Sequence, residues 1–521
     1  MGTNDNTDIF SGNRNNKNER KKAVAENERR ASKKTTRIAI LIIAVLAVLF
    51  AGALYLNSNY IRRTLPAVTV GGRDFSASEY DYFFSTSLFR YQQTVWEAAP
   101  DFAHALLPQQ GVPLRNQIQN HETGGTWADF IHVQTVEMIS NIVQLYNAAR
   151  DYGFVLTDAA RYDMEQEILA FQEEIFHELQ GRTFEDNLRV LYGRGMNEAA
   201  FRELYEFIFT AGSFSEHMRD SFTFTQHDLD EYYEENRDNL DNFTFRQFVV
   251  WAEIYDFDDE DNIEAAFDEA RRVALEISTG IGSHDTFITA AFNFDPFSFG
   301  EPDSTLRMLP GSELEETYAS WMQDSTRTYG DMLTVDDVNG VAIIMFADRD
   351  GNDYRMAEMR QILIMREQVW PWMFEEGEED PEYIEATESA EREMRERAST
   401  VYELFTAGGA TEALLIELMD EHSDDFVPGG HYTEITKMHG HNKMVPEIED
   451  WLFAPGRSVG DFALIETHFG YHLVYFSGHG KIFRDFLADS SLRNTSHGEW
   501  IDGFGMLSVD RRWGLRLTSQ W

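Results

Sequence analysis

A histidine, His472, stands in the stretch ETHFGYHLVYF (Glu466–Phe476), among apolar residues that follow a Phe-Gly-Tyr turn. Alternating apolar residues are typical of a β-strand. A histidine in such a strand is either a hydrogen-bonded core residue or one half of an active site, since a neutral imidazole carries one donor and one acceptor. The rest of the sequence limits the kinds of reaction in which His472 could take part. It has no cysteine, and it shows no Ser/His/Asp signature, phosphate-binding loop or dinucleotide fingerprint.

The strand that carries His472 closes the second copy of an internal repeat. FRQFVVW (Phe245–Trp251) matches MRQILIM (Met359–Met365). Five later residues also recur at identical spacings: Trp321, Arg327, Gly330, Asp331 and Gly340 match Trp451, Arg457, Gly460, Asp461 and Gly470. The pattern predicts two copies of one α/β domain, 243–350 and 356–480. We expect the extra residues of the second copy to lie in the block that runs from HSDD to EDWLF (His422–Phe453).

The second copy also carries a characteristic order of motifs. MRQILI is followed by the helical stretch AEREMRERASTVYELFTAGG, and then by EHSDD, PGG, KMVPEIEDWLF, GRSVGDF and ETHFGYHLVYF. In this order they resemble a parvulin-type peptidyl-prolyl isomerase, the rotamase domain of PpiC, PrsA and SurA proteins. Upstream, VTVGGRDFSASEYDYFF and the helical patterns up to DEYYEENRD resemble the N-terminal chaperone region of the same foldases. The resemblance covers about 66–480.

The reaction that this resemblance implies needs no nucleophile, metal or cofactor. Rotation about an X-Pro bond crosses a barrier of about 18–20 kcal/mol, because the planar amide must lose its resonance. The uncatalysed step takes roughly tens to hundreds of seconds, which is slow enough to limit folding. A catalyst has to hold the proline ring and favour the twisted amide over the planar one.

The resemblance also implies roles for individual residues. His472 falls on the second of the family's paired histidines, and Thr467 falls on the threonine that precedes it. Asp425 falls on the family's Cys/Asp position, with Asp424 as the alternative if the alignment slips by one. The positions that line the family's proline pocket fall on four residues: Met444, Ile448, Phe453 and Tyr432.

Two features depart from the family pattern. The family's first histidine is Gln361 here, which can donate and accept hydrogen bonds but cannot titrate. The family's pocket aromatic is Ile448 here, and its usual pocket leucine is Tyr432. In the first copy Gln247 takes that position and Ala342 takes the position of His472, so we expect the first copy to be non-catalytic. His472 as a core histidine stays an open alternative. A metal site at His439 and His441 is disfavoured, because their spacing matches no standard ligand set.

The N-terminal part of the chain predicts a membrane anchor. Ile38–Leu56 contains 19 uncharged, largely apolar residues, and Lys and Arg residues precede it. We therefore expect a cytoplasmic basic tail over 1–37, a transmembrane helix over 38–56, and the bulk of the chain outside the cell. The alternative is a cleaved signal peptide, for which Ala51–Ala53 is an imperfect cleavage site.

Composition and periodicity complete the predicted organisation. The net charge of −46 excludes a general nucleic-acid binder, which needs a basic surface, and favours a solvated acidic one. Region 66–242 is expected to be mostly α, with a hairpin at its start and a helix capped at Ser76 or Ser78. An aromatic tail occupies 481–521. The predicted fold class is a multidomain α+β protein.

The sequence leaves two functions open. The first is a membrane-anchored extracytoplasmic foldase that binds unfolded, proline-containing secreted polypeptides and isomerises X-Pro bonds in its last domain. The second is a non-catalytic holdase or secretion scaffold whose isomerase domains have both decayed. Gln361 and Ile448 favour the second function, and the intact MVP and FGYH segments favour the first.

Overall fold

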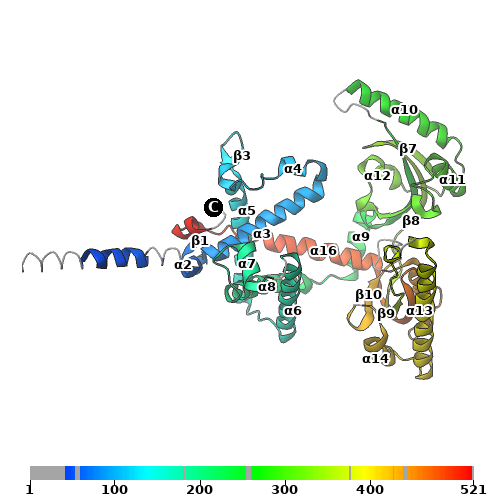
Figure 1. Cartoon of the computed structure of the whole chain (residues 1–521). Coiled ribbons are helices and arrows are strands. Elements are labelled where there is room, and N and C mark those ends of the chain that lie inside the picture. The colour runs from blue at the N-terminus through cyan, green and yellow to red at the C-terminus, as the bar shows by residue number, and fades with distance from the viewer. Residues whose placement is uncertain are drawn as a thin grey trace, which may run out of the picture. The chain divides into compact units, whose positions relative to one another are not determined.

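The computed structural model of the chain describes residues 41–52, 55, 59–179, 182–253, 260–374, 377–425, 427–437 and 444–518. The chain divides into two compact units, Met1–Ser221 with His497–Trp521, and Phe222–Ser496. Figure 1 follows them along the chain. Four sheets and the helices between them give the described part of the chain an α+β, multidomain architecture.

The prediction of a transmembrane helix over 38–56 is wrong for the described residues. Residues 41–52 are helical and exposed. No helix in the described part of the chain is long and apolar enough to cross a membrane. Residues 38–40, 53, 54 and 56 of the predicted span, and the basic tail before it, lie outside the described residues.

The first unit begins with the hairpin β1 (Pro66–Val70) and β2 (Arg73–Ser76). Ser76 then caps α3 (Ala77–Ala98) in a capping box with Glu79. The third strand of this sheet is β13 (Val509–Arg511), which pairs antiparallel with β1. The sheet packs with the long helices α5 (Trp127–Tyr152) and α8 (Glu198–Ser221) around one apolar core.

Shorter elements complete the first unit. They are α2 (Asn59–Thr64), η1 (Pro100–Phe102), α4 (Ala103–Leu106), η2 (Leu114–Asn116), β3 (Ile118–Asn120), β4 (Gly125–Thr126), α6 (Asp158–Glu178), α7 (Phe184–Tyr192) and η8 (Trp513–Leu517). In the second unit, α9 (Gln226–Leu240) precedes two domains that share one order of elements.

The first domain contains β5 (Asn242–Trp251), α10 (Glu260–Ser278), α11 (His284–Phe294), η3 (Pro302–Thr305), β6 (Leu306–Pro310), η4 (Gly311–Glu313), α12 (Glu316–Met322), β7 (Met332–Asp337) and β8 (Gly340–Asp350). The second contains β9 (Arg355–Met365), η5 (Pro371–Met373), η6 (Gly377–Glu379), α13 (Pro381–Ala407), α14 (Glu412–His422), η7 (Pro428–Gly430), β10 (His431–Ile435), α15 (Pro446–Leu452), β11 (Phe462–Thr467) and β12 (Gly470–Ile482). α16 (Phe483–Asp502) follows and leads the chain back to the first unit.

The two domains carry sheets of the same topology. Their strand orders are β6-β5-β8-β7 and β10-β9-β12-β11, and every pairing is antiparallel. The copies are therefore α+β domains, not the α/β domains that the strand–helix alternation suggested, because successive strands return in the opposite direction. The equivalent helices α12 and α15 have the same length, seven residues each.

The recurrent residues make the same contacts in both copies. The guanidinium of Arg327 lies 4.8 Å from the ring centroid of Trp321, and that of Arg457 lies 3.7 Å from the ring of Trp451. Each arginine also pairs with the aspartate four residues later. These repeated stacking and ion-pair contacts explain why the spacings in the sequence are identical.

The extra residues of the second copy do not lie in the block from His422 to Phe453. The connection from β5 to α10 runs over 252–259, whereas the connection from β9 to α13 runs over 366–380. In addition, α13 has 27 residues where α10 has 19. The insertion consists of an arm between β9 and α13 and a longer α13, and it could not be located from the sequence because the arm has no counterpart to align.

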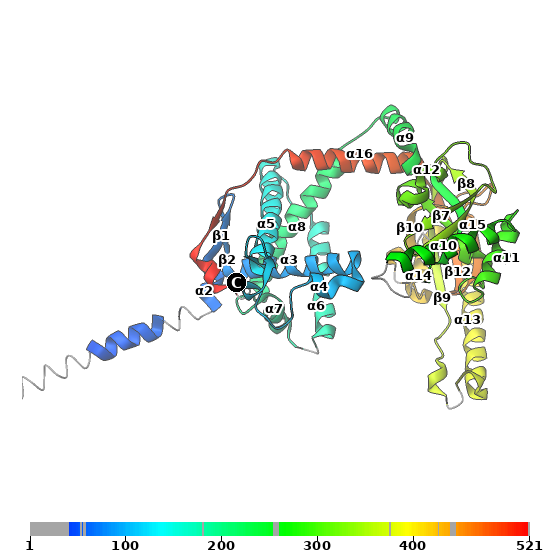
Figure 2. The same cartoon turned by 90° about the horizontal axis from the view of Figure 1, so that it is seen from above.

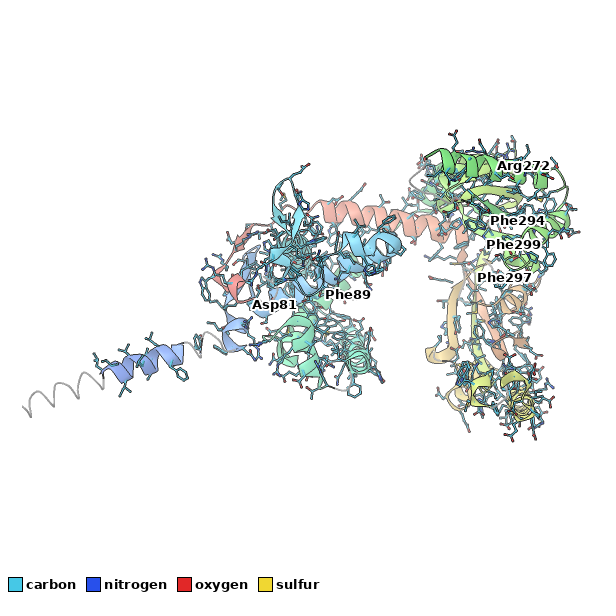
Figure 3. The ribbon with its side chains drawn as sticks, turned by 45° about the horizontal axis from the view of Figure 1, so that its top comes forward. Asp81, Phe89, Arg272, Phe294, Phe297 and Phe299 are labelled. Carbon is cyan, nitrogen blue, oxygen red and sulfur yellow. The ribbon has the colours of Figure 1, made fainter. Side chains whose placement is uncertain are left out.

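Apolar side chains fill both faces of the first copy's sheet. On one face the ring of Phe248 contacts those of Phe294 and Phe299, with centroids 5.9 and 5.8 Å away. Phe297, between those two residues in the chain, is exposed (Figure 3). Helices α10 and α11 cover this face.

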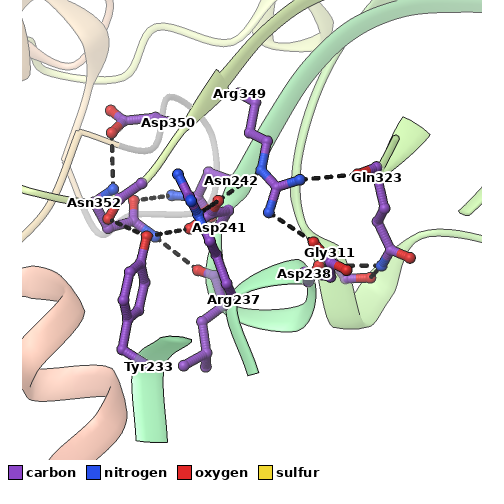
Figure 4. Close-up of polar contacts among 12 residues, drawn as sticks. Tyr233, Arg237, Asp238, Asp241, Asn242, Gly311, Gln323, Arg349, Asp350 and Asn352 are labelled. Atoms are coloured by element: carbon purple, nitrogen blue, oxygen red, sulfur yellow. Dashed lines mark hydrogen bonds and ion pairs between the residues drawn. The ribbon is translucent and has the colours of Figure 1, made fainter. Parts of the chain in front are cut away.

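A buried polar network joins the start of the first copy to its end (Figure 4). Asp241 is fully buried, and its carboxylate accepts hydrogen bonds from Tyr233 at 2.5 Å and from Arg349 at 2.6 Å. The amide of Asn242 donates to the side chain of Asn352 at 2.8 Å. The network thus fastens α9, β5 and β8 at the point where the chain passes to β9.

The recurrent glycines Gly340 and Gly470 lie where the strands approach each other. A Cβ at Gly470 would stand 2.2 Å from the carbonyl oxygen of Ile364, and its φ is +143°. We expect Gly470→Ala to destabilise the protein by about 2–4 kcal/mol, through strain and overlap. Gly478→Ala, in the same strand with open space around it, is the control. Urea unfolding of the two variants tests this, and equal midpoints would contradict it.

Candidate functional site

Gln361 and His472 lie on the two central strands of the second copy's sheet, β9 and β12. His472 pairs in register with Leu363, which places it diagonally opposite Gln361. Side chains alternate along a strand, so Gln361 shares a face with Met359, and His472 shares that face with Val474. Both apolar neighbours belong to the core beneath α15.

A chain of hydrogen bonds runs through His472. The hydroxyl of Thr467 lies 2.8 Å from His472 Nε2, and His472 Nδ1 lies 2.9 Å from Gln361 Oε1. Gln361 Nε2 donates to Asp425 Oδ2 at 2.7 Å. The hydroxyl of Tyr432 donates to the same carboxylate oxygen at 2.8 Å. The fold brings together the four residues that the sequence assigns to catalysis, together with Tyr432.

The carboxylate fixes the direction of every bond in this chain. An ionised Asp425 only accepts, so the amide of Gln361 must turn its NH₂ toward Asp425 and its oxygen toward His472. His472 then donates from Nδ1, and its Nε2 accepts from Thr467. Hydrogen bonds that point one way polarise one another. The N–H and O–H dipoles of the chain therefore point toward Asp425 and stabilise the negative charge of its carboxylate.

Burial sets the protonation state of the site. His472 and Gln361 are each only 4% exposed. Desolvation lowers the pKa of His472 to about 4, although the negative charge of Asp425 acts in the opposite direction. Burial and the contact with Asp425 raise the pKa of the Tyr432 hydroxyl well above its usual value. At neutral pH the imidazole is therefore neutral and Tyr432 is a donor.

The structure distinguishes Asp425 from its neighbour Asp424. Asp424 accepts a hydrogen bond from the backbone N–H of Met365 at 2.8 Å and forms an ion pair with Arg397 at 3.1 Å. It therefore extends the end of β9. The carboxylate that meets Gln361 is that of Asp425.

The four predicted pocket residues belong to one apolar cluster or pack against it. Met444 and Ile448 are buried in this cluster, on the same sheet face as His472. Tyr432 packs against it and joins the polar chain through its hydroxyl. Phe453 turns its ring toward Tyr354, with centroids 5.6 Å apart, and toward the ammonium of Lys437.

The first copy has filled the corresponding space with apolar side chains. Ala342 stands where the second copy has His472, and Tyr318 in α12 stands where α15 has Ile448. Tyr318 is buried, and its ring lies 5.8 Å from that of Phe245. Leu314 occupies the position of Met444, so an apolar lining is present without the polar chain.

Sequence reasoning missed the residue that fixes Asp425. The hydroxyl of Ser423 accepts from the backbone N–H groups of Leu363 and Asp425, at 3.2 and 3.1 Å. A serine two residues before an aspartate is typical of a local side-chain turn, and this signal was available in HSDD.

His439 and His441 lie outside the described residues. In the described part of the chain, no group of three or more histidine or acidic side chains is placed to hold a metal ion.

Comparison with known proteins finds similar chains among solved structures. No family model matches the chain, and no curated protein matches it. Among solved structures, it is similar to PrsA from Bacillus subtilis, with 12% identity over 43% of this chain and 73% of that chain and a TM-score of 0.14. It is also similar to a structure reported for PEB4 and Cj1289, two SurA-like chaperones of Campylobacter jejuni. That match has 13% identity over 55% of this chain and 82% of that one, and a TM-score of 0.17.

These neighbours, PrsA and SurA-like chaperones, are proteins of the kind that the motif order in the second copy resembles. TM-scores this low carry no argument about what this chain does. Its function has to be argued from the geometry of the site.

Proposed function

We propose that this chain is a foldase that binds unfolded polypeptides and isomerises X-Pro bonds in its second copy, residues 356–480. One observation carries the proposal: the continuous chain of hydrogen bonds from Thr467 through His472 and Gln361 to Asp425. The first copy has alanine, Ala342, at the position of His472, so it cannot form this chain of hydrogen bonds.

The proposed mechanism transfers no proton. Twisting the X-Pro amide makes its nitrogen more basic and uncouples its carbonyl, so the catalyst has to favour that charge distribution. Thr467, Tyr432 and Asp425 are half-buried, at the two ends of the chain. These are the groups that a client can reach, and we assign the contact with the twisted amide to them.

His472 and Gln361 act differently, as positioning residues. Both nitrogens of His472 are engaged within the protein, and both side chains are almost completely buried. Their role is to hold Thr467 and Asp425 in a fixed orientation and to couple these two residues electrostatically through the hydrogen bonds. A glutamine serves this purpose because it donates and accepts at once.

One specific observation favours the alternative, a holdase without isomerase activity. The first copy is packed with Tyr318 and Phe245 where the second copy has polar groups, and the imidazole of the second copy has no free nitrogen. Chaperoning would then be the activity of both copies. Secreted clients and an extracytoplasmic location stay predictions under either function.

The test is cis/trans exchange of a proline peptide, measured by NMR with the whole chain added. We expect exchange above the uncatalysed rate, and Asp425→Ala should lower it roughly tenfold, because the polarised chain loses its acceptor. The matched control is Asp420→Ala, which alters a carboxylate of α14 outside the chain of hydrogen bonds. Exchange at the uncatalysed rate with intact protein would establish the holdase instead.

A further inference from the structure

The inserted arm of the second copy, residues 366–380, carries two exposed tryptophans. Trp370 and Trp372 stack with ring centroids 4.4 Å apart and an interplanar angle of 23°. They are 40% and 73% exposed, and Met373 beside them is exposed as well. Large apolar side chains exposed together on a protein surface mark a site of interaction.

Local contacts hold the pair in place. The turn Pro371–Met373 is closed by hydrogen bonds from Met373 N to Trp370 O and from Phe374 N to Pro371 O, both 3.1 Å. The ring of Phe374 packs edge-on against Tyr383 of α13, at 5.6 Å. Figure 2 shows the connection from β9 beside α13. Stacked rings on a fixed turn lose little conformational entropy when they bind.

The arm occurs only in the copy that has the polar chain. The first copy passes from β5 to α10 over 252–259 and has one exposed tryptophan, Trp251, at the end of its strand. An insertion that accompanies His472 is expected to serve the substrate of that copy. The shared feature of such substrates would be proline in an extended chain.

The acidic residues near the tryptophan pair favour a positively charged ligand. Glu378, Glu379 and Glu382 follow the tryptophans, at the end of the arm and the start of α13. A second copy of this chain would bring the same carboxylates and a net charge of −46, so self-association is disfavoured. Cations are attracted to the face of an indole, and proline-rich segments dock on aromatic side chains.

We propose that Trp370 and Trp372 bind extended, basic, proline-containing segments of the client polypeptide. This inference rests on the proposed function, because it identifies the clients of the second copy. The tryptophan pair provides flat surfaces for proline rings, and the acidic residues beside it attract lysine and arginine.

The test measures binding of labelled Lys-Pro repeat peptides to the whole chain by fluorescence anisotropy. The Trp370→Ala/Trp372→Ala variant should raise the Kd at least about fivefold, since tryptophans that become buried when a partner binds carry much of the affinity of an interface. Trp251→Ala, which removes an exposed tryptophan from the first copy, is the matched control and should leave the Kd unchanged. Thermal unfolding of each variant shows whether the fold is intact.

Several outcomes would overturn the inference. If Lys-Ala peptides bound as tightly as Lys-Pro peptides, proline would not be recognised. If Glu-Pro peptides bound as tightly as Lys-Pro peptides, positive charge would not be recognised. Tryptophan-dependent binding to phosphatidylcholine vesicles instead of peptides would make the pair a membrane contact.

The outcomes also separate this inference from the proposed function. An unchanged Kd in the double variant, beside normal exchange catalysis, would overturn the inference alone. Loss of affinity in the double variant, in a protein that shows no catalysis, would support the inference and overturn only the catalytic part of the function.

Discussion

Replacing His472 by alanine should lower the rate of X-Pro exchange at least about tenfold, which is ~1.4 kcal/mol in the barrier. The reason is that Thr467 and Gln361 would each lose their partner in a buried chain, and the groups that face the client would no longer be held. NMR exchange spectroscopy measures the rate. His479→Ala is the control, since His479 lies in the same strand, is exposed, and its ring lies 4.9 Å from that of Phe476.

Two further measurements distinguish positioning from a merely structural role of His472. His472→Asn can still donate toward Gln361 and should restore part of the rate. In the unsubstituted protein, the rate should be constant above about pH 5.5 and fall as the pH approaches 4, where the imidazole gains a proton and Nε2 can no longer accept from Thr467. A variant that changes only the melting temperature would make His472 a core residue.

The same pKa of His472 also determines how the stability of the folded protein changes with pH. In the unfolded chain a histidine titrates near 6.5, above the folded value of about 4. The unfolded state therefore binds the proton more readily, and the stability contributed by neutral His472 is complete above about pH 6.5. It is lost as the pH falls from there through 4.

Replacing Asp241 by alanine should destabilise the second unit by about 3–5 kcal/mol, the usual cost of removing one partner of a buried ion pair. Arg349 and Tyr233 would lose the carboxylate that receives their hydrogen bonds, and that carboxylate is completely buried. Urea unfolding of the whole chain measures the loss. Asp268→Ala is the control, since its ion pair with Arg271 is exposed and should contribute little. Equal midpoints would show that the junction carries little of the stability.

Much of the second unit could be predicted because its signals are local. Gly340 and Gly470 recur because a side chain there would strike the neighbouring strand, and the arginine–tryptophan pairs recur because they stack in both copies. Such contacts leave fixed spacings in a sequence. The insertion left none, since Trp370 and Trp372 have no equivalents in the first copy.

Other features depend on contacts that no spacing records. The strand β13 pairs with β1 from more than four hundred residues away, and no sequence pattern in either segment predicts this pairing. The apolar stretch over 38–56 predicts a membrane span by composition alone, but no helix in the described part of the chain is long and apolar enough to cross a membrane. The contact of the Phe453 ring with Tyr354 is another that no motif predicts.

The pairing of β13 with β1 has a consequence for how the chain is made. On the ribosome, β1 and β2 emerge early, but the edge of β1 that β13 covers stays open until the whole of Phe222–Ser496 has been synthesised. An open strand edge is a template for pairing with other chains. The first unit therefore depends on Val509–Arg511 to close its sheet, so a ribosome that stops before these residues would release a protein with one finished unit and one unprotected edge.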